Sequence, residues 1–329
     1  MTVTTADEAL RDATTDSVTF AFGDASAELF GIARLGLSGA PTGPRQGSVL
    51  ALLFAGRTPV AALARGELAV AGDAGWSRLA LAGLQETIEA PLARWTVSFG
   101  SEDGYGFALE FSAVGDPVAL PADAPVGRLG GMAGYEQPCR VRGVVKAGGR
   151  ERTIDALGQR GHAWGDPDWK RIELARTVSA WTSAGCASLT AVRPAGARDH
   201  SEEATWAALW EPEAEPGTSP QASETKPGTS PEASKTKPGT SRRARQVVLD
   251  VEAGRLSTTY DADGHARRAG LELWPAGDTG EESARRASGE VLCGSSLELG
   301  SLRLDCAFFR WHLDGTPGVG RYDILRRVA

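Results

Sequence analysis

The chain is organised around one stretch, Gly158-Gln159-Arg160-Gly161-His162-Ala163-Trp164-Gly165-Asp166-Pro167-Asp168-Trp169. It combines a histidine, two tryptophans, two carboxylates and an arginine, whereas polar chemistry is sparse elsewhere. Its three glycines allow a tight turn or the close approach of another group. The Asp-Pro pair indicates an extended or turning backbone. We therefore expect this stretch to form one wall of any active site.

Apolar residues alternate with polar ones on both sides of this stretch, which is the period of half-buried β-strands. The clearest unit is a hairpin formed by Arg94–Phe99 and Phe107–Ser112, which are joined by a glycine-containing turn. A second hairpin is predicted from Arg140–Val145 and Arg150–Leu157. Many short strands separated by turns every ~8–12 residues predict an all-β fold made of antiparallel barrels or sandwiches.

The length of 329 residues fits two domains, which we place at 1–155 and 156–329. Residues 211–245 differ from the rest because a Pro/Ser/Thr/Lys-rich segment repeats there with a period of 11 residues. Such a tract buries too little apolar surface to offset its ordering entropy, so a disordered insert is expected in the second domain. Weakly helical patterns are confined to Ala6–Arg11 and Glu281–Arg286.

Composition narrows the functional classes. A net charge of −7 and a pI near 5.3 argue against a nucleic-acid partner. The 4 cysteines form no C-x-x-C pair, so we expect free, mostly buried thiols in a reducing compartment. The first residues lack the basic start and apolar run of a secretory signal, and no stretch of about 18 apolar residues occurs. A cytoplasmic protein without a transmembrane segment is expected.

The usual cofactor and nucleophile signatures are missing. The chain has no Walker A motif, no G-x-S-x-G elbow and no H-E-x-x-H, and its glycines at 127, 130, 131 and 134 are not spaced as a dinucleotide fingerprint. We therefore expect no nicotinamide- or nucleotide-dependent enzyme.

His162 is the most suggestive of the histidines because imidazole exchanges protons near neutral pH. Asp166 or Asp168 lies close enough in sequence to orient it. The alternative is a structural histidine that satisfies backbone groups at a tight turn. A metal site built on these three residues would need a distant further ligand, so no metal is expected.

Four further residues carry similar alternatives. Trp164 and Trp169 could line a ligand cavity and stabilise a developing cation, or could simply fill the core. Arg160 could pair with Asp166, Asp168 or Glu136. Buried in an apolar cavity, Glu136 would have a raised pKa and could act as an acid, but an exposed loop glutamate is the simpler alternative.

The central stretch resembles the signature G-x-R-D-H-S-W-G-x-R-D-W of uncharacterised bacterial proteins in the lipocalin-like two-barrel group. That group includes carotenoid hydratases, tocopherol-cyclase-like proteins and fungal Diels–Alderases. Ile88–Trp95, Tyr135-Glu136-Gln137 and Gly318–Tyr322 are similar too. The resemblance implies two lipocalin-like β domains with a hydrophobic pocket near their junction. It also implies hydration or cyclisation of polyenes, prenyl chains or polyketide tails without an organic cofactor.

This chain departs from the signature at two positions, since Gly161 and Ala163 stand where the group has Asp and Ser. If that Asp is the proton donor in relatives, Asp166, Asp168 or Glu136 has to replace it here, or the protein is inactive. If it is structural, its loss affects only stability.

Two functions follow as hypotheses. The first is a hydratase- or cyclase-type lyase or isomerase that moves protons in an apolar pocket onto an isoprenoid- or polyketide-like substrate. The second is a non-catalytic carrier of a lipophilic small molecule. The expected acid/base groups are His162, Asp168 and Glu136. The expected ligand-binding residues are Trp164, Trp169, Trp181, Tyr135 and Arg160.

Overall fold

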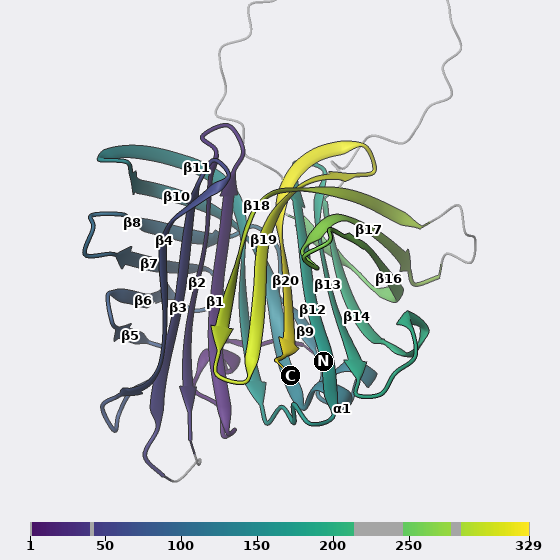
Figure 1. The fold of residues 1–329 in the computed structure, drawn as a ribbon, viewed down its shortest axis with the longest axis horizontal. Coiled ribbons are helices and arrows are strands. Elements are labelled where there is room, and N and C mark those ends of the chain that lie inside the picture. Colours follow the sequence, from purple (N-terminus) through teal and green to yellow (C-terminus); the bar gives the residue numbers. More distant parts are fainter. Residues whose placement is uncertain (1, 40–42, 214–245, 278–283, 329) are drawn as a thin grey trace, which may run out of the picture.

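The computed structural model describes residues 2–39, 43–213, 246–277 and 284–328. These residues form two antiparallel β-sheets that lie side by side, the first on the left and the second on the right of Figure 1. The predicted all-β fold is confirmed. Residues 214–245, which carry the repeats, lie outside the described residues.

The first sheet has 11 strands in the order β4-β3-β2-β1-β11-β10-β8-β7-β6-β5, with β9 paired to β10. Its strands are β1 (Thr15–Asp24), β2 (Leu29–Ser38), β3 (Gln46–Ala55), β4 (Thr58–Ala69), β5 (Arg78–Leu81), β6 (Leu84–Ala90), β7 (Arg94–Gly100), β8 (Gly106–Ala113), β9 (Val118–Leu120), β10 (Met132–Ala147) and β11 (Arg150–Gly165). A short 3₁₀ segment, η1 (Thr5–Glu8), precedes it, and the helix α1 (Pro125–Gly130) follows β9.

The second sheet has 9 strands in the order β15-β14-β13-β12-β20-β19-β18-β17-β16. Its strands are β12 (Ile172–Thr182), β13 (Gly185–Pro194), β14 (Ala204–Pro212), β15 (Gln246–Leu249), β16 (Val251–Tyr260), β17 (Ala266–Pro275), β18 (Arg285–Leu299), β19 (Leu302–Leu313) and β20 (Thr316–Arg327). A 3₁₀ segment, η2 (His200–Glu202), lies between β13 and β14.

Each sheet curls around its own core, so we call the two halves the first and the second barrel. In the first, a methyl group added at Gly47 of β3 would lie 2.7 Å from Leu81 of β5. In the second, the Thr205 hydroxyl of β14 donates to the Gly254 carbonyl of β16 at 3.1 Å. Strands far apart in sheet order are therefore neighbours in space, and the inward face of each sheet is removed from water.

The two barrels pack against each other through a third apolar cluster, which we call the junction. Phe308 of β19 lies with its ring centroid 5.5 Å from that of Phe30 in β2 and 5.9 Å from that of Phe54 in β3. Trp181 of β12 and Val319 of β20 belong to the same cluster. Because strands alternate their side chains, residues of β1–β3 and β11 face either the first core or this junction.

The predicted hairpin at 94–112 is confirmed as β7 and β8. The second hairpin is also confirmed, but β10 and β11 are longer than predicted and pair from Met132↔Gly165 to Ala147↔Arg150. The central stretch is therefore a strand up to Gly165, so of the two alternatives for its glycines the tight turn is wrong at His162. Two of its glycines, Gly158 and Gly165, instead allow close approach of backbone carbonyls, 2.3 Å and 2.1 Å from where a methyl group would lie.

The predicted domain boundary at 155/156 lies inside β11, and the chain leaves the first sheet for the second between Gly165 and Ile172. Of the weakly helical patterns, Ala6–Arg11 overlaps η1, whereas Arg285 and Arg286 begin β18. The remainder of Glu281–Arg286 up to residue 283 lies outside the described residues.

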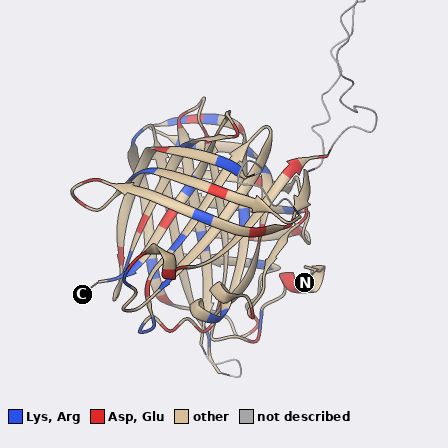
Figure 2. Ribbon diagram, turned by 90° about the vertical axis from the view of Figure 1, so that its right-hand side faces the viewer, with Lys and Arg blue, Asp and Glu red and all other residues tan. Residues whose placement is uncertain are grey.

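All 4 cysteines are free and buried, as expected. Among the residues that the structure describes, no helix is long and apolar enough to cross a membrane. Basic and acidic positions are interspersed along the strands (Figure 2).

Candidate active site

Strand β11 divides the central stretch between two environments. Arg160 and His162 point into the first barrel, where Phe20 and Trp76 are their neighbours. Gln159 points to the junction and contacts Trp181. The paired strand β10 alternates in the same way, because Tyr135 lies opposite His162 and Glu136 lies opposite Gly161. The structure therefore separates His162 and Glu136 onto opposite faces of one hairpin.

His162 forms a buried pair with Asp16 of β1. Its Nε2 lies 2.6 Å from Asp16 Oδ1, and both side chains are fully buried. The other oxygen of Asp16 accepts the backbone N–H of Arg11 at 2.7 Å. The expectation that Asp166 or Asp168 orients His162 is wrong, because the orienting carboxylate comes from the N-terminal strand. His162 Nδ1 is buried and has no hydrogen-bond partner among the described residues.

Three aromatic rings surround the imidazole. Their centroids lie 5.1 Å (Trp164), 5.6 Å (Tyr135) and 6.0 Å (Trp76) from that of His162, and all three meet it edge-on. The guanidinium of Arg11 covers the outer ring, Trp164, at 4.5 Å. His162 thus lies in an aromatic cage that excludes water and offers π surface to positive charge.

Arg160 is the second buried centre of the first barrel. It donates to Glu8 Oε2 of η1 at 2.6 Å and to the Tyr135 hydroxyl. Its guanidinium carbon lies 4.6 Å from the ring of Trp95. The predicted partners of Arg160 (Asp166, Asp168 or Glu136) are therefore wrong. Burial raises the pKa of the Tyr135 hydroxyl, although the Arg160 charge opposes this.

Glu86 of β6 is a buried group that the sequence analysis did not identify. It is fully buried, and neither of its carboxyl oxygens has a hydrogen-bond partner among the described residues. Burial raises its pKa to about 8; the Arg160 charge opposes this rise, and the Glu8 and Asp16 charges add to it. The available signal was alternation, because Leu84 and Glu86 share the buried face of β6.

Glu136 lies at the junction rather than in the first barrel. Its Oε2 accepts from Gln159 Nε2 at 2.5 Å, and its Oε1 lies 3.7 Å from Arg321 Nη2 of β20. The Gln159 carbonyl oxygen accepts from Trp181 Nε1 at 3.1 Å. Burial raises the pKa of Glu136, while the Arg321 charge opposes that rise. Trp181 therefore belongs to the surroundings of Glu136, not to those of His162.

Position 161 has no room for a side chain, because Glu136 occupies the space beside it. A methyl group at position 161 would lie 2.7 Å from Glu136 Oε2. Gly161→Ala should therefore shift the carboxylate away from Gln159 and lower the free energy of unfolding by ~1–2 kcal/mol. Urea denaturation measures this change. The control is Gly66→Ala, where an added methyl meets nothing within 4 Å; equal stability of both variants would contradict this account.

Asp168 and Trp169 lie beyond the end of β11. Asp168 is exposed and accepts the backbone N–H of Lys170 at 2.9 Å, as turn aspartates do. Trp169 packs against the small cluster of Val126, Ile172 and Val192 beside α1. The structure does not bring either residue to His162, whereas Trp164 and Tyr135 contact its ring.

A cleft of about 1400 Å³ lies between the two barrels. Its walls come from both barrels and mix apolar residues, including Leu92, Val114, Leu157, Trp206 and Val248, with polar ones such as Gln137 and Arg140. Gln137 and Leu92 also connect it to the buried groups. The Gln137 amide donates to the carbonyl of Leu92 at 3.0 Å, and the Leu92 N–H donates to Glu8 Oε1 at 3.0 Å. One layer of residues thus separates the cleft from the Glu8–Arg160 pair.

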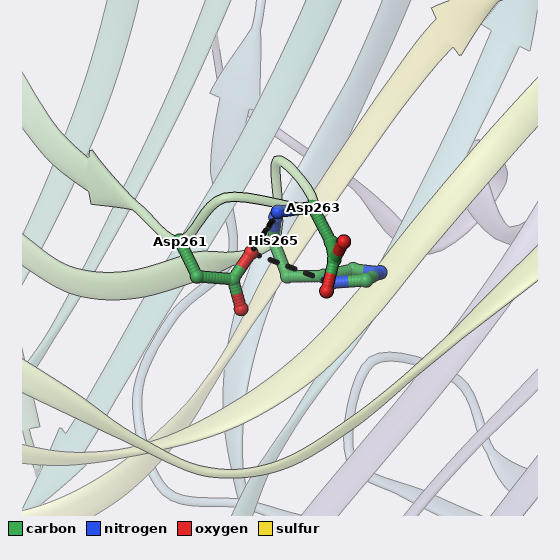
Figure 3. A group of neighbouring side chains, drawn as sticks. All are labelled: Asp261, Asp263 and His265. Carbon is green, nitrogen blue, oxygen red and sulfur yellow. Dashed lines mark hydrogen bonds and ion pairs between the residues drawn. The ribbon is translucent and has the colours of Figure 1, made fainter.

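A cluster of possible metal ligands lies elsewhere, in the turn between β16 and β17 (Figure 3). Asp261 Oδ1 accepts the backbone N–H groups of Asp263 at 3.1 Å and His265 at 2.9 Å. His265 Nε2 lies 3.0 Å from Arg303 Nη2, which is a cation. Both features fit a hydrogen-bonded turn next to positive charge, so we assign no metal to this cluster.

Comparison with known proteins places the chain by fold and family. A family model described as a domain of unknown function, DUF7064, matches residues 6–327. A search of curated proteins finds no matching sequence.

Solved structures share the fold. An AttH-like protein from Nitrosomonas europaea has a TM-score of 0.62 at 10% identity, over 96% of this chain and 93% of that one. CghA crystallised with Sch210972 has a TM-score of 0.57 at 13% identity, over 95% of this chain and 88% of that one. Kievitone hydratase from Nectria haematococca has a TM-score of 0.54 at 10% identity, over 99% of this chain and 95% of that one. At these identities the likeness concerns the fold alone.

Proposed function

The chain belongs to the family described as a domain of unknown function, DUF7064, and we propose that it is an enzyme working without an organic cofactor. Its reaction is the hydration, isomerisation or cyclisation of a double bond in an isoprenoid- or polyketide-like substrate by proton transfer. The observation that carries the proposal is the His162–Asp16 pair inside an aromatic cage, with Nδ1 of His162 unpartnered among the described residues.

The pairing fixes what His162 can do. A carboxylate only accepts hydrogen bonds, so pairing with Asp16 favours the tautomer that carries its hydrogen on Nε2 and a lone pair on Nδ1, which is buried and unpartnered among the described residues. Nδ1 can therefore accept a proton from a substrate carbon or from an attacking water. Asp16 then stabilises the imidazolium that forms, at 2.6 Å.

The cage suits the same chemistry. Protonating an alkene creates positive charge on carbon, and the rings of Trp76, Tyr135 and Trp164 surround the imidazole of His162. Aromatic faces stabilise cations, most strongly where water is excluded. The apolar part of the cleft wall offers a place for the rest of a hydrophobic substrate behind Leu92 and Gln137. The solved hydratase and the CghA complex share the fold, which motivates this class of reaction.

One observation favours a different function, a carrier of a lipophilic small molecule. None of the three buried acid/base groups, His162, Glu86 and Glu136, lines the cleft. A carrier needs only an apolar cavity with polar groups at its rim. Under either function the partner is a small hydrophobic molecule. The free, buried thiols fit a reducing compartment, and we propose a cytoplasmic location.

Lipids co-purifying with the protein from its own host distinguish the two functions. For an enzyme, mass spectrometry should find a chemically altered lipophile in the wild-type protein and the unaltered precursor in His162→Gln. The same unaltered lipophile in both proteins would make the protein a carrier. Trp206→Ala, which removes an aromatic wall of the cleft, should reduce the amount bound in either case.

A further inference from the structure

The two barrels contain matching buried triads. In the first, Arg160 bonds the Tyr135 hydroxyl and Glu8, the last residue of η1. In the second, Arg176 of β12 bonds Glu203 beside η2 and lies 3.4 Å from the Tyr322 hydroxyl of β20. Both arginines are fully buried. Because the arrangement recurs, an Arg–Tyr–Glu triad by itself is a feature of the scaffold.

Glu86 distinguishes the first barrel from the second. The described part of the second sheet also contains buried unpartnered polar atoms, such as Arg176 Nε, Ser179 Oγ and Trp311 Nε1, but no carboxyl there has two unpartnered oxygens. In the first, a carboxyl with two unpartnered oxygens is accompanied by unpartnered nitrogens of Trp76, Trp95 and His162. Buried polar groups in proteins normally have hydrogen-bond partners, so a group of buried atoms without partners is unusual. We therefore interpret these atoms as a polar site within an apolar core.

Register fixes the place of Glu86. It lies between Leu79 of β5 and Val97 of β7, with Trp95 two residues away on the same face of β7. The charged groups acting on it are Arg160 from β11, Glu8 from η1 and Asp16 from β1. The two carboxylates and the burial disfavour its ionised form, and burial raises its pKa to about 8. A neutral carboxyl has a proton to donate, and the described residues offer it no acceptor.

We propose that Glu86 is the acid of the site, donating its proton to the substrate double bond while His162 Nδ1 serves as the base. This inference rests on the proposed function. The Glu86 O–H bond breaks as a new C–H bond forms, leaving a cationic carbon. In hydration, water adds to that carbon and gives a proton to Nδ1. In isomerisation, Nδ1 removes a proton from the neighbouring carbon. A proton then returns from His162 to Glu86, so no oxidant or co-reactant is needed.

Infrared spectroscopy tests whether Glu86 holds the proton. The wild-type protein should show the C=O stretch of a neutral carboxyl at pH 7, and Glu86→Gln should lack it. An ionised Glu86 at pH 7 overturns the proposal. Glu86→Met should also raise the midpoint of urea unfolding, because it removes an unpartnered carboxyl while keeping the volume. A clear loss of stability in Glu86→Met would instead assign Glu86 a structural role and overturn the proposal.

The rate at which the protein labels a probe molecule tests the role of Glu86 in the reaction. With geranylgeraniol as an isoprenoid probe in D₂O, the wild-type protein should form carbon-bound deuterium, and Glu86→Gln should do so ~10²–10⁴-fold more slowly. The wild-type rate should fall as pH rises through the titration of Glu86, a fall absent in the variant. Equal labelling rates in both overturn the role of Glu86. A wild-type protein that labels no probe contradicts the proposed function, while the infrared result still decides the protonation of Glu86.

Discussion

Arg160→Met should lower the free energy of unfolding by ~3–5 kcal/mol, because it leaves Glu8 as an uncompensated buried charge. Arg160 is fully buried and Glu8 is 4% exposed, so water cannot replace the lost guanidinium. Besides Arg160, Glu8 accepts the backbone N–H of Leu92 at 3.0 Å. Urea denaturation followed by tryptophan fluorescence measures the loss.

The second barrel supplies the matched control. Arg176→Met removes the equivalent arginine, but Glu203 keeps Arg193, whose Nη2 lies 2.7 Å from Glu203 Oε1. Arg176→Met should therefore lower the free energy of unfolding clearly less than Arg160→Met does. Adding Glu8→Gln to Arg160→Met should recover part of the stability, since the unpaired charge is removed. Equal losses for Arg160→Met and Arg176→Met, or no recovery in the double variant, would contradict this account of the first barrel.

The stability of the wild-type protein should fall as pH rises from about 5 to about 8, relative to that of Glu86→Gln. The pKa of Glu86 is raised from 4.5 to about 8 in the folded protein. The folded state therefore keeps a proton that the unfolded chain has released in this window. The contribution of Glu86 to stability is fully present below its pKa in the unfolded chain, and it is lost as the pH rises through its pKa in the folded protein.

The size of the effect follows from the shift in pKa. The shift corresponds to a change of at most ~5 kcal/mol in the free energy of unfolding. Urea unfolding of both proteins at a series of pH values measures it, and the difference between their unfolding free energies should level off above about pH 8. Comparing the wild-type protein with Glu86→Gln removes the contribution of every other titrating group, because both proteins contain those groups. Parallel curves across the whole range would show that Glu86 is ionised in the folded state.

Local alternation made most of the fold predictable. The hairpin at 94–112 was identified because its strands are adjacent in sequence and each shows a period of two. The same rule placed β10 beside β11 but underestimated their length. The glycines of the central stretch left a tight turn and a close approach as alternatives, and the backbone is an extended strand up to Gly165 whose glycines make room for neighbouring groups.

The partners in the site could not be predicted from sequence spacing. Asp16 and His162 are 146 residues apart, and Glu8 and Arg160 are 152 apart, so their contacts depend on the pairing of β1 with β11 and on η1, which precedes β1. The separation of His162 from Glu136 follows from one residue of strand register, which sends neighbours to opposite faces. The burial of Glu86 was predictable from the sequence, because the alternation in β6 places it on the buried face.

Labelling in D₂O tests the central claim, that proton transfer takes place at His162 inside the first barrel. Geranylgeraniol is incubated with the wild-type protein, with His162→Gln and with Glu151→Gln, an exposed substitution in the hairpin that carries His162. We predict carbon-bound deuterium with the wild-type protein and Glu151→Gln, and none above background with His162→Gln. Undiminished labelling by His162→Gln, or labelling abolished by Glu136→Gln but not by His162→Gln, would contradict the claim and move the chemistry to the junction.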